Sequence, residues 1–306
     1  MQFPETELII TDKGNVYHLD INEEHIADDI LLVGDQGRVE QISNMFSKVE
    51  CKIQHREFVT HTGMFNGKRI SVISTGIGTD NIDIVINELD AAVNIDLKTR
   101  TLKDKMRSLN IIRLGTSGAL QADIPVNSLV VSQYGLGLDG LLNYYADYKS
   151  INEDFISDSF MKHTGWTANL PYPYCVKADD TLFKKFAEGN PTGITATAPG
   201  FYGPQGRQLR LKAAKPNLNE LLTTFSAPLS SPSPVGEGFR VRSGEVLRIT
   251  NFEMETSALY GLGKLLNHKC LTVCVIIANR VIKQFTSDYK KSVEHLITNS
   301  LERLTA

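Results

Sequence analysis

Short apolar runs rich in valine and isoleucine recur along this chain and constrain its fold more than any other feature. They are ILLVG (30–34), ISVIST (70–75), NIIRLG (110–115), NSLVVSQ (127–133) and LTVCVIIAN (271–279). Runs of this length and composition are typical of strands that are buried on both faces of a sheet. We therefore expect a central sheet whose strands run through the middle of the protein.

Helical patterns lie between these strands and at the end of the chain. Apolar residues recur three and four positions apart in four segments, 38–49, 82–93, 254–267 and 292–304. Strands that alternate with helices indicate a mostly parallel sheet covered on both sides. We predict an α/β fold, a three-layer α/β/α arrangement with a mixed, largely parallel central sheet, in a single domain that spans residues 1–306. SAPLSSPSPVGEG (226–238) is predicted to be a surface loop.

Charge and hydropathy exclude several classes of function. The 306 residues carry a formal net charge of −3, which gives no global field to attract nucleic acid or an anionic membrane. The longest strongly apolar run, 271–278, is too short to cross a bilayer, and the N-terminus lacks the pattern of a secretory signal. We expect a soluble cytoplasmic protein whose four cysteines are reduced thiols.

Neither a metal nor an organic cofactor is expected. Cys270 and Cys274 lie four residues apart in a predicted strand, whereas zinc sites usually use CxxC turns. GLGLDG (135–140) fits the dinucleotide fingerprint GxGxxG, but the following LLNYYADYK is a poor helix for a βαβ unit.

Glycine-rich segments follow three of the predicted strands: GDQGR (34–38), STGIGT (74–79) and RLGTSGA (113–119). Turns at the carboxyl ends of strands expose backbone N–H groups that bind anions. Arg38 and Arg113 accompany two of these segments. Arg113 lies inside an apolar strand, so its guanidinium needs an anion, which is either a bound ligand or the carboxylate of a structural salt bridge.

Two carboxylates, Glu253 and Glu255, stand directly before an apolar run in NFEMETSALYGL (251–262). A buried carboxylate loses several kcal/mol of solvation unless a partner replaces water. No lysine or arginine lies within the stretch. The two acids therefore either point into solvent or line a cavity where a polar ligand binds.

Taken in order, seven motifs resemble those of the nucleoside phosphorylase family, and within it the uridine phosphorylases. They are ILLVGDQGRV, IQHREF (53–58), STGIG, IIRLGTSGAL, FYGPQGR (201–207), NFEMETSA and IIANR (276–280). The resemblance extends from about residue 17 to the closing helix, so it covers nearly the whole chain.

The resemblance implies a role for individual residues. The implied phosphate site consists of Gly34, Arg38, Arg113 and Thr116, with Arg56 from a neighbouring subunit. The implied ribose site consists of Met254 and Glu255, with His18 from the neighbour. The implied base site consists of Phe201, Gln205, Arg207 and Arg280. Within these sets, Arg113, Glu255 and Arg207 are the expected catalytic residues, and Glu253 is interpreted as a structural carboxylate.

The chain also departs from the family pattern. Gln36 stands where GDPxR has a proline, and FYGPQ exchanges the glycine and proline of FYPGQ. Some members bind a monovalent cation between subunits; Glu57 is present here, but Asn81 replaces a serine, which weakens the expectation of that cation. Purine-specific relatives end the last strand with Ser-Asp, whereas this chain has Asn279 and Arg280, which favours a pyrimidine.

The implied reaction is the reversible phosphorolysis of uridine to uracil and ribose 1-phosphate, a pentosyl transfer in nucleoside salvage with inorganic phosphate as co-substrate. Alternatives are a phosphorylase or nucleosidase of the same fold acting on another nucleoside (thymidine, deoxyuridine or a purine nucleoside), and a non-catalytic nucleoside-binding relative. A nucleosidase would not need three phosphate-binding arginines. Sharing Arg56 and His18 between chains requires a homo-oligomer, a dimer or a hexamer built from dimers.

Overall fold

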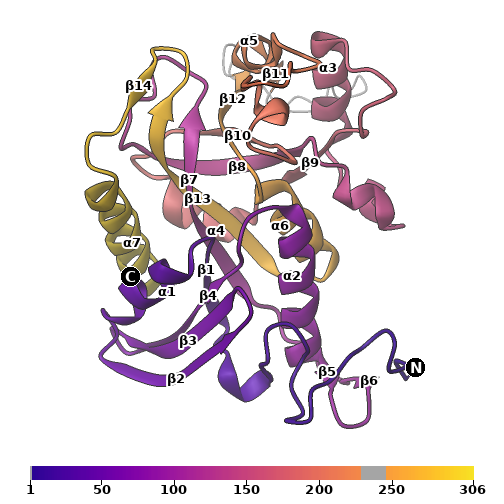
Figure 1. Cartoon of the computed structure of the whole chain (residues 1–306). Helices are drawn as coiled ribbons and strands as arrows, with labels where there is room; N and C mark the ends of the chain where they lie inside the picture. Colours follow the sequence, from indigo (N-terminus) through magenta and orange to yellow (C-terminus); the bar gives the residue numbers. More distant parts are fainter. Residues whose placement is uncertain (1, 229–245) are drawn as a thin grey trace, which may run out of the picture.

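The computed structural model describes residues 2–228 and 246–306, and a twelve-stranded mixed sheet forms its centre (Figure 1). Along the main path the strand order is β11-β12-β10-β8-β13-β7-β1-β4-β3-β2, with β14 paired to β13 and β9 paired to β8. The strands are β1 (Asp29–Val33), β2 (Lys48–His55), β3 (Phe58–Phe65), β4 (Lys68–Ser74), β7 (Asn110–Ala119), β8 (Leu129–Gly137), β9 (Tyr174–Lys177), β10 (Thr192–Thr197), β11 (Ser226–Pro228), β12 (Val246–Glu253), β13 (Lys269–Asn279) and β14 (Gln284–Phe285).

Parallel pairings join most of the central strands of this sheet, in two blocks that meet at the antiparallel pair β8–β13. β1 pairs in parallel with β4 and β7, β7 with β13, and β10 with β8 and β12. The outer strands β2, β3, β9, β11 and β14 pair antiparallel with their neighbours. This mixed sheet, with parallel strands at its centre, confirms the predicted fold class.

Helices cover both faces of the sheet, which gives the three predicted layers. Figure 1 shows α1 and α7 on one side, and α2 and α6 on the other. The helices are α1 (Gln36–Ser43), α2 (Thr79–Asn94), α3 (Asp154–Thr164), α4 (Asp180–Ala187), α5 (Leu218–Thr224), α6 (Thr256–Leu265) and α7 (Tyr289–Thr305), with single 3-10 turns η1 (Glu23–His25), η2 (Leu141–Tyr144), η3 (Tyr148–Ser150) and η4 (Gly203–Gln205). None of the helices among the described residues combines the length and apolar character needed to cross a membrane.

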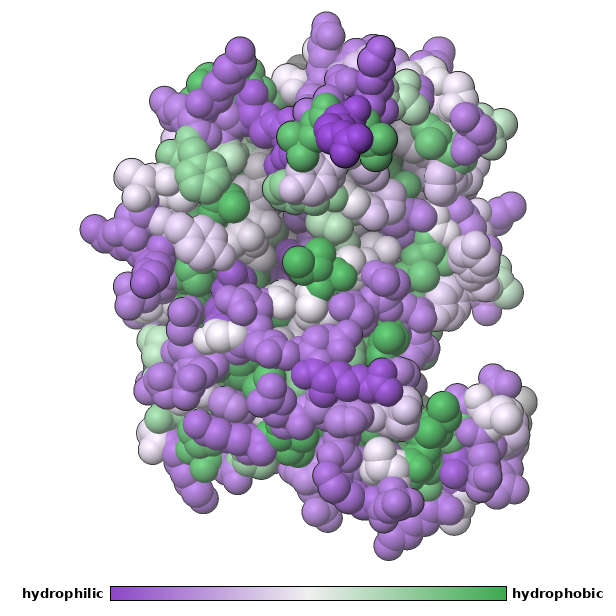
Figure 2. Space-filling model, in the orientation of Figure 1, coloured by the Kyte–Doolittle hydropathy of each residue, from purple (hydrophilic) through white to green (hydrophobic). Residues whose placement is uncertain are grey.

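The predicted strands are buried as their composition requires. All five residues of β1, DILLV, are buried, and the four apolar ones pack with those of β4 and β7 in one large hydrophobic core. On the face shown in Figure 2, hydrophilic side chains predominate and hydrophobic ones form small separate groups. The apolar runs therefore supply the core rather than the surface.

Some predicted boundaries were wrong. The helix predicted over 38–49 ends at Ser43, because Phe46 turns into the core and the Ser47 amide already donates to Met64 at the start of the β2–β3 hairpin. Within the charged segment 94–109, β5 (Ile95–Asp96) pairs with β6 (Thr101–Leu102). Of the predicted loop 226–238, the first three residues form β11 and the rest lie outside the described residues. The single domain over 1–306 stays a prediction.

Candidate active site

A cavity of about 770 Å³ opens where the carboxyl ends of several strands meet. The turns after β1 and β4, the middle of β7, the end of β12 and the segment after β10 all contribute to its wall. Most of the residues predicted from the sequence line it together: Gly34, Arg38, Arg113, Thr116, Phe201, Gln205, Arg207, Met254 and Glu255. His18, Arg56 and Arg280 are not part of its lining.

Arg113 obtains its anion from the two glutamates. Its side chain is buried, with Nη1 3.1 Å from Glu253 Oε2, while Nη2 donates to Glu255 Oε2. Burial alone would lower the pKa of the guanidinium, but the charges of Glu255 and Glu253 raise it above its ordinary value. The structural salt bridge, one of the two alternatives that the sequence left open for Arg113, is therefore present. Arg113 also lines the cavity.

Gly115 is needed for this arrangement. A Cβ at this position would lie 2.0 Å from Nη1 of Arg113, so a larger residue would displace the guanidinium. The segment 113–119 was predicted to open into a glycine turn, and that prediction was wrong because β7 continues through Ala119. Gly115 makes room for a side chain rather than for a turn.

Glu253 is fixed by neutral donors as well as by Arg113. Its carboxylate accepts hydrogen bonds from Thr197 Oγ1 at 2.9 Å and from the backbone amides of Glu255 and Thr256 at 3.0 Å. These amides lie at the start of α6, where backbone N–H groups lack partners within the helix. The interpretation of Glu253 as a structural carboxylate agrees with these contacts.

Glu255 has less compensation for its burial. Its side chain accepts a hydrogen bond from the Gly78 amide at 2.8 Å, in the glycine turn after β4, and pairs with Arg113. Burial raises the pKa of its carboxyl to about 7, Arg113 opposes the rise, and the neighbouring charge of Glu253 adds to it. Glu255 therefore retains a proton to higher pH than an ordinary glutamate does.

Arg38 is a buried cation of a different kind. Its Nη1 donates to the Leu114 carbonyl and its Nη2 to the Tyr289 hydroxyl, both at 3.0 Å, and the residue is 5% exposed. No carboxylate of the described residues lies within ion-pair distance of it. A buried guanidinium held only by neutral acceptors keeps its charge available for an anion in the cavity.

Another part of the cavity lining comes from the segment 201–207. Arg207 Nη1 donates to the Phe201 carbonyl at 2.7 Å and to Gln205 Oε1, and its guanidinium lies 3.8 Å from the centroid of the Phe201 ring. Burial and the positive charge of Arg280 lower the pKa of Arg207 to about 10. Arg280 lies just behind the lining, 5.5 Å from the centroid of the Phe252 ring.

His18 and Arg56 lie together on another part of the chain. Arg56 Nη2 donates to the Tyr17 hydroxyl at 3.1 Å, and His18 Nδ1 lies 2.6 Å from Glu88 Oε1. The backbone of Arg56 is tied to the cavity, because Gln36, which lines it, donates from Nε2 to the Arg56 carbonyl. Within one chain neither side chain reaches the other predicted residues, so their role across a subunit boundary stays a prediction.

Sequence reasoning missed Thr197 and Tyr289. Tyr289 begins α7 and meets Arg38 across 251 positions, so no local pattern links the two. Thr197 ends β10, whose TGITAT sequence is rich in β-branched residues. That composition could have identified a further strand ending at the cavity.

Residues 28–306 match the family model of the phosphorylase superfamily. The chain belongs to the phosphorylase superfamily. This membership confirms the resemblance predicted from the seven motifs, and it covers the whole cavity described above.

Relatives within the phosphorylase superfamily agree with this assignment. The chain is 29% identical to a uridine phosphorylase of Thermococcus kodakarensis over 93% of this chain and 84% of that protein. A shorter match, 34% identity over 38% of this chain and 44% of the relative, links it to a DeoD-type purine nucleoside phosphorylase of Caldanaerobacter subterraneus.

Solved structures show the same fold. A Trypanosoma brucei nucleoside phosphorylase that shows uridine phosphorylase activity superposes with a TM-score of 0.84 at 31% identity, over 97% of this chain and 99% of that one. A uridine phosphorylase of Phytophthora capsici superposes with a TM-score of 0.65 at 21% identity, over 100% and 98% of the two chains. At 21% identity, the Phytophthora structure is evidence for the fold alone.

Proposed function

We propose that this chain catalyses the reversible phosphorolysis of uridine to uracil and ribose 1-phosphate. One observation carries the proposal. A single cavity contains Arg38, whose buried guanidinium has no carboxylate partner among the described residues, next to the Arg113–Glu255 pair. Gln205 and Arg207 line another part of the same cavity. The likeness to the Thermococcus and Trypanosoma proteins supports uridine as the nucleoside.

Phosphate is bound in this proposal by Arg38 and Arg113, with the Thr116 hydroxyl and the backbone at Gly34. Arg113 lines the cavity, and its Nε has no acceptor in the described part of the chain. Bidentate hydrogen bonds from guanidinium groups suit a phosphate oxyanion and hold it below C1′ of the ribose. Such positioning lowers a barrier by roughly 7–11 kcal/mol in well-oriented reactions.

The sugar is bound by Met254 and Glu255. As the bond between C1′ and the base breaks, positive charge develops on the ribose, and the carboxylate of Glu255 stabilises it while accepting hydrogen bonds from the hydroxyl groups. Only the ionised form of Glu255 does both. Because its pKa is raised to about 7, a rise in pH through this value increases the competent fraction.

The departing uracil carries negative charge, and two cations face it. With a pKa of about 10, Arg207 is protonated at neutral pH and donates to a uracil carbonyl, while Arg280 adds positive potential from behind Phe252. Gln205 has both a donor and an acceptor for the N3–H and carbonyl edge of the base. Phe201 supplies an aromatic face for stacking.

A purine nucleoside is disfavoured by the use of Asn279. Its Nδ2 donates to the carbonyls of Gln121 and Ile124 at 2.8 Å, and its Oδ1 accepts from the amides of Val281 and Ile282. All of its hydrogen-bonding capacity therefore serves the backbone, and it carries no acidic group for a purine N7.

Assembly, location and role in the cell belong to this proposal as well. A homo-oligomer would bring Arg56 and His18 of one chain to the cavity of the next, and the enzyme would act in nucleoside salvage in the cytoplasm. It would need no cofactor besides its co-substrate phosphate.

Initial rates of base release test the choice of nucleoside. In saturating phosphate, purified protein is given uridine, 2′-deoxyuridine, thymidine and inosine in parallel, and the free base is measured by chromatography. We expect kcat/KM for uridine to exceed that for inosine at least tenfold. Preference for inosine, or no base release from any of the four, would overturn the proposal.

A further inference from the structure

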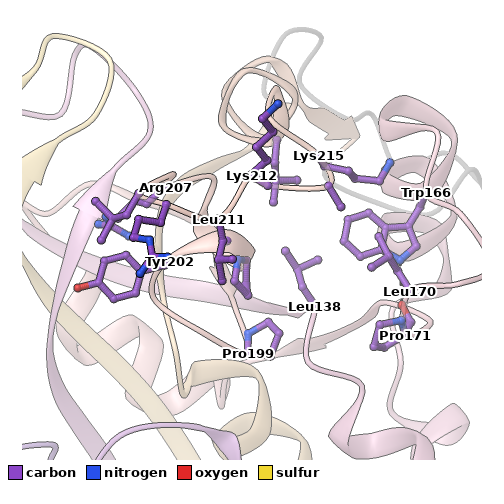
Figure 3. A pocket seen from close by; sticks show the side chains of 17 residues that line it. Leu138, Trp166, Leu170, Pro171, Pro199, Tyr202, Arg207, Leu211, Lys212 and Lys215 are labelled. Carbon is purple, nitrogen blue, oxygen red and sulfur yellow. Dashed lines mark hydrogen bonds between the residues drawn. The ribbon is translucent and has the colours of Figure 1, made fainter.

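A second cavity, of about 740 Å³, lies against the same 201–207 segment as the active site (Figure 3). Phe201 and Gln205 line the active-site cavity, Tyr202, Gly203 and Pro204 line the second one, and Arg207 lines both. We propose that the second cavity binds a small organic anion with a flat apolar body, of the class of aromatic carboxylates and sulfonates, and that its occupant controls the base site through this shared segment.

Apolar side chains from separate elements form the body of this cavity. Figure 3 shows Leu138, Trp166 and Leu211 around it, from the end of β8, the turn after α3 and the loop before α5. Leu138 is 4% exposed, whereas Leu211 is 86% exposed. Burial of an exposed leucine side chain stabilises a complex, so a ligand that covers Leu211 gains from it. Trp166 adds a flat surface for stacking.

The charges of the lining select an anion. Among the described residues, the basic side chains that line the second cavity are Arg207, Arg210, Lys212 and Lys215, and none of the lining residues is acidic. Figure 3 shows Lys212 and Lys215 along one edge. Lys215 Nζ lies 5.6 Å from the centroid of the Trp166 ring, so an anion held by Lys215 has its apolar body next to the indole. These cations attract an anionic group on the ligand, whereas a neutral ligand gains nothing from them.

Coupling to the active site follows from the shared wall. A ligand that packs against Tyr202 and Pro204 changes the position of Gln205 and Arg207, which this part of the inference takes, from the proposed function, to contact uracil. Phosphate binds elsewhere in the active-site cavity. The ligand should therefore change KM for the nucleoside and leave KM for phosphate unaltered, and by linkage uracil should change the affinity of the ligand by a similar factor.

Trp166 makes binding directly measurable because it is the only tryptophan of the chain. The probe is 1-anilinonaphthalene-8-sulfonate, whose binding quenches tryptophan fluorescence by energy transfer. We expect saturable quenching of Trp166 that is weakened at least tenfold by Lys212→Glu and changed less than twofold by Lys149→Glu, an exposed lysine on η3. N-phenyl-1-naphthylamine, which lacks the sulfonate, should bind at least tenfold more weakly than the anionic probe.

Several results would overturn the inference. Equal probe affinity in Lys212→Glu and wild type would remove the anion site, and competition by inorganic phosphate would place the probe in the active site. Trp166 fluorescence that depends on protein concentration without probe would make a second copy of the chain the occupant. An unchanged KM for uridine under saturating probe would refute the coupling, and failure of the protein to cleave uridine would refute the proposed function while leaving the fluorescence test intact.

Discussion

The replacement of Glu255 by glutamine tests the electrostatics of the candidate site most sharply. The side chain is 4% exposed and pairs with Arg113, which also pairs with Glu253. Glutamine keeps the size of the side chain and removes its charge, which leaves one carboxylate for one guanidinium. The variant should lose phosphorolysis and yet gain stability relative to wild type as the pH rises.

The magnitude follows from the raised pKa. In the unfolded chain the carboxyl has its ordinary pKa of 4.5, and in the folded protein the pKa is about 7, so between these values the folded state binds more protons. Stability contributed by this group is therefore present at low pH and lost as the pH rises through the folded pKa. At ~1.36 kcal/mol per pKa unit, wild type should lose roughly 2–3 kcal/mol from this group between pH 5 and pH 8.

Urea denaturation at pH 5 and pH 8 measures the effect. The difference in unfolding free energy between Glu255→Gln and wild type should shift by roughly 2–3 kcal/mol in favour of the variant at pH 8. Glu302→Gln, at an exposed position of α7, serves as the matched control and should show no such shift. Parallel pH dependence in Glu255→Gln and wild type, or undiminished uridine cleavage by the variant, would refute the reasoning.

Three further predictions concern the arginines and the base site. Arg38→Met should raise KM for phosphate at least tenfold with a small drop in Tm, since it removes two hydrogen bonds to neutral acceptors; an unchanged KM would contradict the phosphate role. Arg113→Met should lower the free energy of unfolding by about 3–5 kcal/mol, because it leaves two buried glutamates without their cation; denaturation as in wild type would show that these ion pairs do not stabilise the fold. Gln205→Ala and Arg207→Ala should each lower the preference for uridine over inosine while KM for phosphate changes less than twofold, and the base site is misplaced if both variants keep full activity and selectivity.

The central strands could be predicted because they are apolar on both faces. β1, β4, β7, β8 and β13 coincide with the five apolar runs. The hairpin of β2 and β3 was missed, since β2 is largely exposed and carries polar residues. The helix boundary at Ser43 depends on a tertiary contact, the pairing of Ser47 with Met64, which no local pattern reveals.

The candidate site was predictable as a set of residues but not as a geometry. Motif order selected Arg38, Arg113 and Glu255, which the fold brings to one cavity. The pairing of Arg113 with Glu255 joins residues 142 positions apart, and the sequence left open whether the partner was a carboxylate or a ligand. The second cavity gave no sequence signal, because its lining comes from the ends of unrelated elements.

The central claim is that phosphate, held by the two buried guanidinium groups, attacks C1′ of uridine. Phosphorus-31 NMR of the reaction mixture, with uracil measured in parallel, tests it directly. With phosphate present, ribose 1-phosphate should form in amounts equal to uracil, and without phosphate uracil release should cease. Uracil release at the same rate without phosphate, with free ribose as the product, would contradict the claim and make water the nucleophile.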